Sequence, residues 1–559
     1  MIRLKTAYLL LTGACVLAFA GAFGFDFLRC QDDWAYVTGN PNLVLDWAHF
    51  VGMVTTPVLG LWTPLPQASY FLDYAIDGFR PEVYRAITLL WHIGAVLLAF
   101  RLFRELMIRR NAAFFAALLF AIHPQRVESV VWISERKDVM CAFFFLLGCV
   151  LYLTSLRKKR QSLYWFSLAA MLAALGSKPS AVALPAVLVA LDFHLRGKIR
   201  LKPVLPHIML AGLFLCGGLL RDTANNFAQG GFRPLVGIRN YCTYFLKTFY
   251  PSELYPLYPF ITLTWVDWTL IAACVGALAW FWLNRRKQTV RDILPMLFAA
   301  GAVLAPVSGV MIFSNADFAD RYSYIPSVFF LAAVMLILPA PPDKFRKWVW
   351  LWPALLLVRT WLYLPNWNGD DAMLSASCAA PNYNFYAAGL YACELVKQDN
   401  ARDGRTVFRD CGRGDPRTRR SMKHLEIMDR MLALMERYQA GKRAELLPEF
   451  TAILNPDANR KRLQDLHYGC LIPFMTAFAD CALAAGHPAM AGRIYEGLAD
   501  AYPGERFTAP FYRGVAMMLR RDHAAAVRCF QAAVEASPSD EAARRNLEAA
   551  RQRLARPKP

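Results

Sequence analysis

Several motifs that mark soluble enzymes are missing from this 559-residue chain. It has no Walker A sequence, no GxGxxG before a strand, no HExxH and no CxxC pair. Histidine is scarce at 9 residues, and His49, His92 and His123 are not spaced as metal ligands. The sequence therefore gives no indication of a P-loop nucleotidase, a dinucleotide-dependent oxidoreductase or a zinc enzyme.

Charge is also scarce. Charged residues make up 19% of the chain and hydrophobic residues 56%, against about 25% and roughly 45–50% in soluble domains. This composition argues against a soluble enzyme and excludes a disordered or collagen-like chain. The net charge of +20 would suggest a nucleic-acid partner in a soluble protein. However, residues 1–364 hold 34 Lys and Arg against 19 Asp and Glu, a net +15 lying between long apolar runs. We therefore expect a membrane protein with no nucleic-acid partner.

The apolar runs predict an all-α polytopic domain over residues 1–364, followed by a helical extracytoplasmic domain over 365–559. Runs of spanning length lie at about 7–25, 84–104, 138–156, 204–220, 265–284, 290–313, 322–340 and 347–364. Shorter runs at 111–123, 163–177 and 180–194 are bounded by loop signals. Together they predict eleven transmembrane helices.

Basic residues set the orientation. Clusters such as 101–110, 157–160, 196–202 and 285–287 fall on one side of the membrane if the aromatic stretch 235–260 does not cross it. We interpret that stretch as interfacial or re-entrant. The N-terminus is then cytoplasmic and the C-terminal domain extracytoplasmic. The first run could instead be a cleaved signal peptide, but its apolar character continues to Phe25, which favours a retained span.

The C-terminal domain contains a repeat signal. Ala526, Phe530, Ala533 and Pro538, with Gly514 upstream, fit half of a tetratricopeptide unit. A weaker copy consists of Ala491, Tyr495, Leu498 and Pro503. We expect a tetratricopeptide-like α-solenoid that holds a polypeptide. The alternative is a helical hairpin array with no partner of its own.

Four polar clusters share the predicted outer side. The first contains Asp32 and Asp33 among aromatic residues, and the others lie at 123–138, 177–180 and 317–326. Adjacent carboxylates can hold a base with a raised pKa, bind a metal or cap a short helix. Taken singly, the other three clusters are compatible with solvated loops.

Together, these clusters place cations on the outer side, against the positive-inside trend, at Arg136, Lys137, Lys178 and Arg321. Such cations need an anionic partner, and a lipid phosphate lies at this depth. Asp32, Asp33 and Glu128 are the acid–base candidates beside it.

These residues also resemble a known family. Asp32-Asp33 with Asn40, His123-Pro124 running on to Glu128 and Arg136-Lys137-Asp138, Ser177-Lys178-Pro179 and Ala319-Asp320-Arg321-Tyr322 are similar to the transmembrane and tetratricopeptide-repeat-containing O-mannosyltransferases and their bacterial relatives. The resemblance implies a GT-C membrane fold. It also implies a glycosyltransferase that moves a sugar from a polyprenyl-phosphate carrier to a hydroxyl acceptor outside the membrane, with inversion at the anomeric carbon.

Carried over by position, the resemblance makes Asp32 the general base, with Asp33 supporting it or replacing it. Glu128 would position the acceptor or the base. The four cations, Arg136, Lys137, Lys178 and Arg321, would bind the donor phosphate and stabilise the leaving group. No cofactor is required because phosphate is already a good leaving group, although some GT-C relatives use a divalent cation.

The expected acceptor is Ser or Thr of an exported protein, and the expected location is a bacterial plasma membrane, where the carrier would be undecaprenyl phosphate. Alternatives are a lipid or surface-glycan acceptor, a transporter or flippase of the lipid-linked sugar, and a non-catalytic scaffold.

Overall fold

The computed structural model describes residues 3–220, 233–259, 261, 263–310, 316–345, 347–380, 385–412, 418–441, 443–453, 468–501, 508–536 and 540–555. Over these residues the regular elements are helices, apart from an isolated bridge between Val58 and Leu61. The chain divides into two compact units. The first comprises Met1–Leu28 and Val44–Met373, and the second comprises Arg29–Leu43 and Leu374–Pro559. The all-α prediction is confirmed for the described residues. The predicted domain boundary, after residue 364, falls near the end of the first unit.

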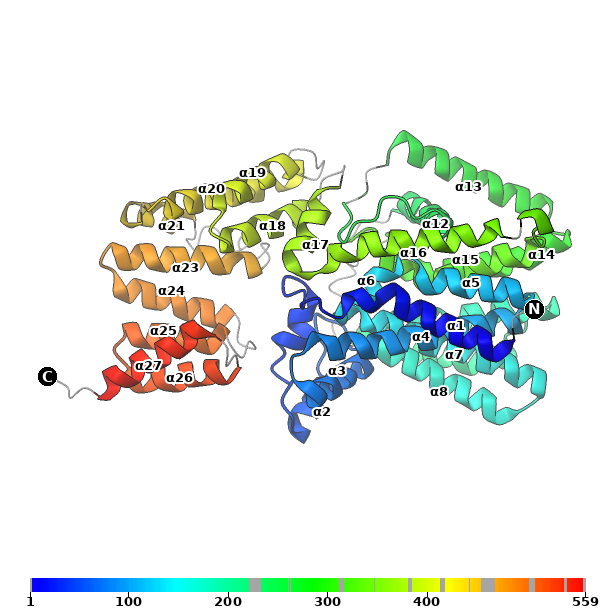
Figure 1. Cartoon of the computed structure of the whole chain (residues 1–559), viewed down its shortest axis with the longest axis horizontal. Helices are drawn as coiled ribbons and strands as arrows, with labels where there is room; N and C mark the ends of the chain where they lie inside the picture. The colour runs from blue at the N-terminus through cyan, green and yellow to red at the C-terminus, as the bar shows by residue number, and fades with distance from the viewer. Residues whose placement is uncertain are drawn as a thin grey trace. The chain divides into compact units, whose positions relative to one another are not determined.

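The first unit is a bundle of apolar helices (Figure 1). Its helices up to the gap at 221–232 are α1 (Leu4–Phe19), α2 (Trp47–Thr55), α3 (Pro64–Asp77), α4 (Pro81–Glu105), α5 (Arg110–Ile122), α6 (Arg126–Val131), α7 (Arg136–Lys158), α8 (Gln161–Ser177), α9 (Leu184–Arg196) and α10 (Leu205–Leu220). Those after the gap are α12 (Pro234–Phe249), α13 (Trp265–Leu283), α14 (Gln288–Leu304), α15 (Pro326–Ile337), α16 (Leu351–Tyr363) and α17 (Gly369–Cys378).

Six helical segments among the described residues are long and apolar enough to cross a membrane. They are Leu4–Ala22, Pro81–Glu105, Ile133–Lys158, Pro179–Arg196, Trp265–Leu283 and Gln288–Val307. Over the described residues each of the eleven predicted runs coincides with a helix, but α5, α8, α10, α15 and α16 are not among these six segments. The chain is a multi-pass membrane protein, and the count of eleven spans and their orientation stay predictions.

The α13 span shows how the sequence places its ends. Thr264 and Asp267 form a capping box that satisfies the first backbone N–H groups of the helix. Exposed tryptophans stand near both ends, Trp265 at the first and Trp282 at the last. The two tryptophans are 17 positions apart, which corresponds to about 25 Å of helix, close to the hydrocarbon thickness. Interfacial tryptophans and the basic run after α13 are typical of a transmembrane helix.

The stretch predicted to be interfacial forms α12 and an irregular segment after it. Buried residues recur along one face of α12 at Val236, Asn240, Tyr244 and Lys247, and this helix packs on α13 and α15. The following residues, up to Pro259, contain no helix. An amphipathic helix with polar residues on its buried face is compatible with the interfacial prediction, and that face brings polar groups into the bundle.

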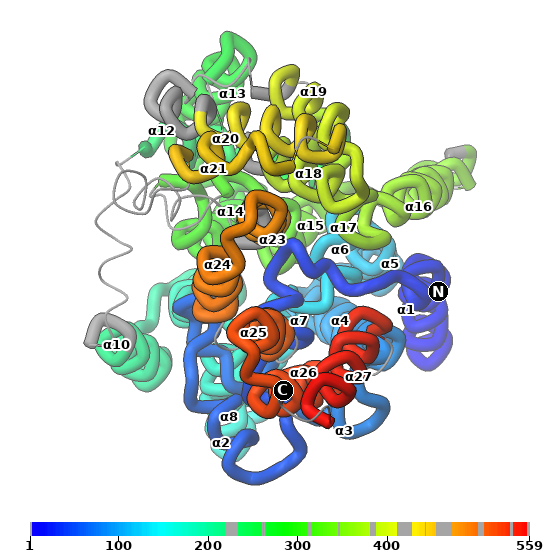
Figure 2. The backbone as a smooth tube through the Cα atoms, turned by 90° about the vertical axis from the view of Figure 1, so that its left-hand side faces the viewer, coloured from blue at the N-terminus to red at the C-terminus, as the bar shows by residue number. Residues whose placement is uncertain are grey.

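The second unit is a succession of helices that follow one another in space in sequence order (Figure 2). They are α18 (Phe385–Lys397), α19 (Ala401–Gly412), α20 (Thr418–Gln439), α21 (Leu447–Ile453), α23 (Tyr468–Ala484), α24 (Pro488–Ala501), α25 (Thr508–Leu519), α26 (His523–Ala536) and α27 (Glu541–Ala555). Neighbouring helices pack pairwise, as α24 on α25 and α25 on α26.

The residues of the stronger repeat signal meet as a tetratricopeptide unit requires. Ala526, Phe530 and Ala533 are buried on α26, and Gly514 of α25 lies against the Phe530 ring. A Cβ atom at Gly514 would stand 2.6 Å from that ring. Pro503 and Pro538 fall outside the described residues. The tetratricopeptide assignment stays a prediction that this close helix contact supports.

Candidate functional site

Several predicted site residues of the first unit gather around α6. Helix α5 ends at Ile122, and the next residue, His123, has extended backbone, as expected for a residue before a proline, here Pro124. The chain then forms α6 and a single 3-10 turn, η3 (Ile133–Glu135), before α7 begins. Because the chain changes direction at the ends of these short elements, the polar segment 123–138 lies in the interior. There, α6 packs against the 3-10 turn η7 (Asp320–Ser323).

Glu128 and Arg321 form the central pair of this region. The Arg321 guanidinium donates to Glu128 Oε1, and the Arg321 backbone N–H donates to Glu128 Oε2 at 2.7 Å. Burial raises the pKa of the Glu128 carboxyl to about 7, while the neighbouring Arg321 charge opposes that rise. Arg321 also lies 3.6 Å from Glu135 Oε1 through its Nε. Two residues far apart in sequence are therefore fixed against each other.

Two lysines complete the region. Lys178, which separates α8 from the next helical turn, contacts Asp138 Oδ1 and lies 3.7 Å from Glu135 Oε2. Lys137 Nζ lies 3.1 Å from Glu135 Oε1. The side chains of these two lysines and of Glu135 and Asp138 are all buried or nearly so. Glu135 therefore bridges cations contributed by α7, by Lys178 and by η7.

We call this group the buried ion cluster. It comprises Lys137, Lys178, Arg321, Glu128, Glu135 and Asp138. Its formal charges balance, three against three. Burying them costs desolvation energy that the mutual attraction offsets only when the partners are well placed.

Arg136 has a different environment from the other predicted cations. Its Nη1 lies 2.5 Å from Asp73 Oδ2, and its Nε donates to Thr88 Oγ1 at 2.9 Å. A third bond runs from Nη2 to the carbonyl oxygen of Tyr84 at 2.6 Å. The side chain is fully buried. These contacts join α7 to α3 and α4, and the phosphate-binding role of Arg136 stays a prediction.

Asp32 and Asp33 belong to the second unit, in the segment Arg29–Leu43. Asp33 is fully buried and precedes a single π-helical turn, η2 (Trp34–Thr38). Its side chain makes no capping bond to that turn, so the helix-cap alternative does not hold for Asp33. Asn40, which follows the turn, accepts from the backbone N–H of Asn42 at 3.0 Å and is also buried. The roles proposed for Asp32 and Asp33 stay predictions.

The structure adds polar residues that the sequence reasoning did not select. Asp320, the neighbour of Arg321, accepts hydrogen bonds from Gln125 at 3.1 Å and from the Tyr258 hydroxyl at 3.0 Å. Lys247 of α12 donates to the same hydroxyl at 3.0 Å. Burial lowers the pKa of Lys247 to about 8, against the opposing attraction of Asp320. The sequence feature that could have identified this group was Lys247, a cation among aromatic residues in the stretch predicted to be interfacial.

Arg126 is a further buried cation that was not selected. Its guanidinium carbon lies 5.0 Å from the centre of the Tyr324 ring and 5.5 Å from that of Phe120. One nitrogen donates to the Ser323 hydroxyl, while Nε and Nη1 have no hydrogen-bond partner within the described part of the chain. Two aromatic faces therefore supply much of what stabilises this charge.

Over the described ranges, no group of three or more His, Cys, Asp or Glu side chains could hold a metal ion. The predicted independence from a cofactor, and the tolerance for a divalent cation, are not tested by this observation. The chemistry available in the first unit is that of positive charges and carboxylates in a site shielded from water.

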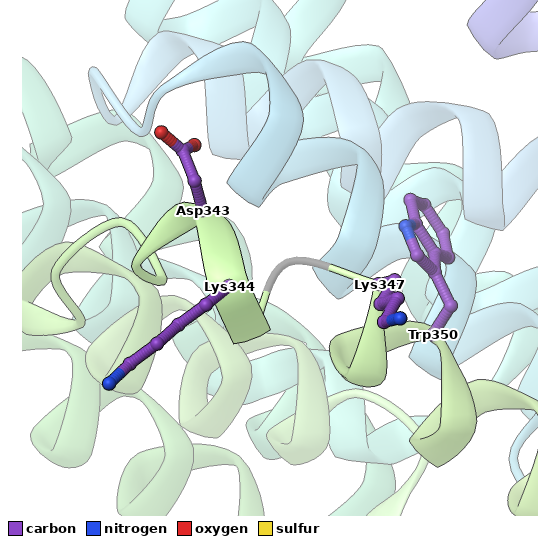
Figure 3. A pocket seen from close by; sticks show the side chains of 4 residues that line it. All are labelled: Asp343, Lys344, Lys347 and Trp350. Carbon is purple, nitrogen blue, oxygen red and sulfur yellow. The ribbon is translucent and has the colours of Figure 1, made fainter.

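A pocket elsewhere in the first unit contains none of the predicted site residues. It is lined by Asp343, Lys344, Lys347 and Trp350, on two 3-10 turns before α16 (Figure 3). The Trp350 ring packs against Phe115, with 6.0 Å between ring centres. Its lysines belong to a loop that the positive-inside rule assigns to the cytoplasm, so we do not include this pocket in the site.

Comparison with known proteins bears on the same region. Residues 63–217 match the family described as dolichyl-phosphate-mannose-protein mannosyltransferase. The chain is 30% identical over 157 residues to mouse protein O-mannosyl-transferase TMTC1, covering 26% of this chain and 17% of the mouse protein. It is 25% identical over 251 residues to human protein O-mannosyl-transferase TMTC4, covering 38% of this chain and 34% of the human protein. The chain thus covers about a third or less of each relative.

Among solved structures, the chain is similar to ArnT from Cupriavidus metallidurans bound to undecaprenyl phosphate, at 14% identity and a TM-score of 0.35, covering 88% of this chain and 80% of that one. The matched family segment contains Glu128, Lys137 and Lys178 but not Arg321. The resemblance predicted from the motifs is confirmed: residues 63–217 match the model of the dolichyl-phosphate-mannose-protein mannosyltransferase family, and the chain is distantly homologous to the TMTC O-mannosyl-transferases.

Proposed function

We propose that this protein is an inverting glycosyltransferase that uses a polyprenyl-phosphate sugar as donor and a hydroxyl group as acceptor on the extracytoplasmic side. The observation that carries the proposal is the buried ion cluster. Lys137 and Lys178 come from the family-matched segment, and Arg321 joins them from a distant part of the chain. Cations held at the ends of apolar helices suit a phosphate carried on a lipid.

In this mechanism the donor phosphate takes the place of a carboxylate beside Arg321 and Lys178. The acceptor oxygen attacks the anomeric carbon from the face opposite the phosphate, and the bond from that carbon to the phosphate oxygen breaks. Negative charge develops on the leaving phosphate, and the two cations stabilise it in surroundings with little water. A single displacement inverts the anomeric configuration.

The acceptor hydroxyl must lose its proton as it attacks. We propose Asp32 as the general base, with Asp33 supporting it or acting in its place. Glu128, released from Arg321 as the phosphate binds, would help to position the acceptor or the base. A carboxylate whose pKa lies near neutrality can change protonation state at little cost, which suits this part of the reaction.

The proposed acceptor is Ser or Thr of an exported protein, held by the helical second unit. The pairwise packing of α24, α25 and α26 supports this, because stacked helix pairs commonly hold polypeptides. The proposed location is a bacterial plasma membrane, with undecaprenyl phosphate as carrier, the N-terminus in the cytoplasm and the C-terminal region outside. A lipid or surface glycan is the alternative acceptor.

The test uses the purified full chain in lipid nanodiscs with a radiolabelled polyprenyl-phosphate sugar and extracts of exported proteins. We expect the wild type to transfer label to protein, and the Asp32→Asn variant to lose transfer while keeping its thermal stability. Asp77→Asn, a change at an exposed carboxylate, is the matched control and should keep full activity. Full activity in both Asp32→Asn and Asp33→Asn would contradict the assigned base. Movement of the donor across the bilayer without transfer would instead indicate a flippase.

A further inference from the structure

An aromatic group beside Arg321 carries buried hydrogen-bonding atoms that have few or no partners among the described residues. Trp132 closes α6, whereas Tyr363 and Trp367 belong to α16 and the 3-10 turn after it. All three are at most 4% exposed. Among the described residues, the indole Nε1 atom of Trp132 has no hydrogen-bond partner, and the Trp367 indole and the Tyr363 hydroxyl have none except each other.

Such atoms are unusual enough to need an explanation. A buried donor left without a partner costs about 1–3 kcal/mol, and native structures leave few of them. Here the Trp132 indole lacks a partner, and the Trp367 indole and the Tyr363 hydroxyl beside it share one weak contact. The ring centres of Trp132 and Trp367 are 6.0 Å apart, and those of Tyr363 and Trp367 are 6.4 Å apart. A ligand with several acceptor oxygens would satisfy them.

The position of the group limits what that ligand is. The Arg321 guanidinium carbon lies 5.5 Å from the centre of the Trp132 ring, and the Trp132 ring in turn contacts the Trp367 ring. A sugar bonded to the phosphate held by Arg321 would lie at about this distance. The C–H face of a sugar packs on an indole ring, and its hydroxyl oxygens accept from indole N–H and phenol O–H groups.

We propose that Trp132, Tyr363 and Trp367 form the sugar-recognition subsite for the hexose carried on the donor phosphate. This inference rests on the proposed function, and it divides the donor between two sets of residues. The buried ion cluster binds the phosphate, and the aromatic group binds the sugar. The aromatic group therefore selects a sugar-bearing carrier over the spent carrier.

The test measures equilibrium binding of three probes to the full chain in nanodiscs: polyprenyl-phosphate mannose, polyprenyl-phosphate glucose and polyprenyl phosphate alone. We expect the wild type to bind at least one sugar-bearing carrier more tightly than the bare carrier. Trp132→Phe and Trp367→Phe keep an aromatic ring but remove the N–H donor. Each should weaken binding of that sugar-bearing carrier by about 3- to 10-fold and leave the bare carrier unaffected.

The matched control is Trp165→Phe, at a tryptophan of α8 that is 59% exposed, and it should change neither affinity. Tyr363→Phe removes only a hydroxyl group and serves where a tryptophan variant does not fold. Equal wild-type affinity for all three probes would overturn the proposal, as would Trp132→Phe and Trp367→Phe variants that keep the wild-type preference.

A transfer assay on the same samples separates the two proposals. Binding that depends on the sugar and on these aromatic residues, with no sugar transferred to any hydroxyl acceptor, would contradict the proposed function but support the subsite. Transfer with the wild-type donor KM in all three aromatic variants would support the proposed function and contradict the subsite.

Discussion

Arg321 contacts both carboxylate oxygens of Glu128, one through its side chain and the other through its backbone N–H at 2.7 Å. The backbone bond fixes where η7 lies against α6, and the side-chain bond neutralises the cation. If Arg321 is a phosphate ligand, Glu128 occupies its place before the donor arrives. Glu128 and the donor phosphate then compete for one guanidinium group.

This competition predicts that Glu128→Gln strengthens binding of the carrier. The glutamine oxygen can still accept from the Arg321 backbone, but the group no longer carries a charge. We expect the affinity for polyprenyl phosphate to rise by about tenfold, equivalent to about 1.4 kcal/mol, in a binding assay at pH 8. Glu82→Gln, an exposed carboxylate at the start of α4, is the control. Unchanged or weaker carrier binding in Glu128→Gln would count against the competition.

The raised pKa of Glu128 predicts a pH dependence of stability with a defined sign. The pKa is about 7 in the folded protein, against an ordinary value of 4.5. Between these values the folded state binds more protons than the unfolded state, so this group lowers stability as the pH rises from about 4.5 to 7. Thermal melts of wild type and Glu128→Gln should converge at low pH, with the variant relatively more stable near pH 8. A parallel pH dependence in the two proteins would contradict this assignment.

The contacts of Arg136 predict a structural role. Asp73→Asn leaves a buried guanidinium without its charged partner, which costs about 3–5 kcal/mol. We expect a clear fall in the melting temperature of the first unit and no selective loss of carrier affinity in the protein that remains folded. Asp77→Asn, on the same helix but exposed, should melt as the wild type does. A selective loss of carrier binding without a loss of stability would restore Arg136 to the phosphate site.

The close contact in the second unit gives a prediction about the acceptor. Gly514→Ala would place a methyl group 2.6 Å from the Phe530 ring, and such overpacking costs about 1–3 kcal/mol. We expect weaker transfer to exported proteins but unchanged transfer to a short hydroxyl acceptor. Gly497→Ala, where no atom lies within 4 Å of the added carbon, is the control. Equal loss with both acceptors would argue that the second unit does not hold the protein substrate.

Much of the fold was predictable because hydrophobic length and charge asymmetry act locally. Each apolar run became a helix, and the capping pair Thr264 and Asp267 is visible in the sequence. The packing of Gly514 on Phe530 was also predictable, since a small residue facing a large one is part of the repeat pattern. By contrast, α2 and α3 in the first loop have no long apolar run and were not anticipated.

The candidate site was predictable in its residue types but not in its pairing. The sequence singled out Lys137, Lys178 and Arg321 because they oppose the positive-inside trend. It could not show that Glu135 bridges all three, because that depends on where η7 and Lys178 meet α7. Arg136 shows the limit of the argument, since its buried partner Asp73 lies 63 residues away in the sequence. Asp320 and Lys247 were missed because Tyr258 links them only after the chain has folded.

The central claim is tested most directly by the transfer reaction itself. The full chain in nanodiscs is mixed with a labelled polyprenyl-phosphate sugar and an exported-protein acceptor, and the anomeric configuration of the product is determined by NMR. The account predicts a protein-linked sugar of inverted configuration, lost in Arg321→Gln and retained in Arg80→Gln, a change at an exposed arginine. A product of retained configuration, or full transfer by Arg321→Gln, would contradict it.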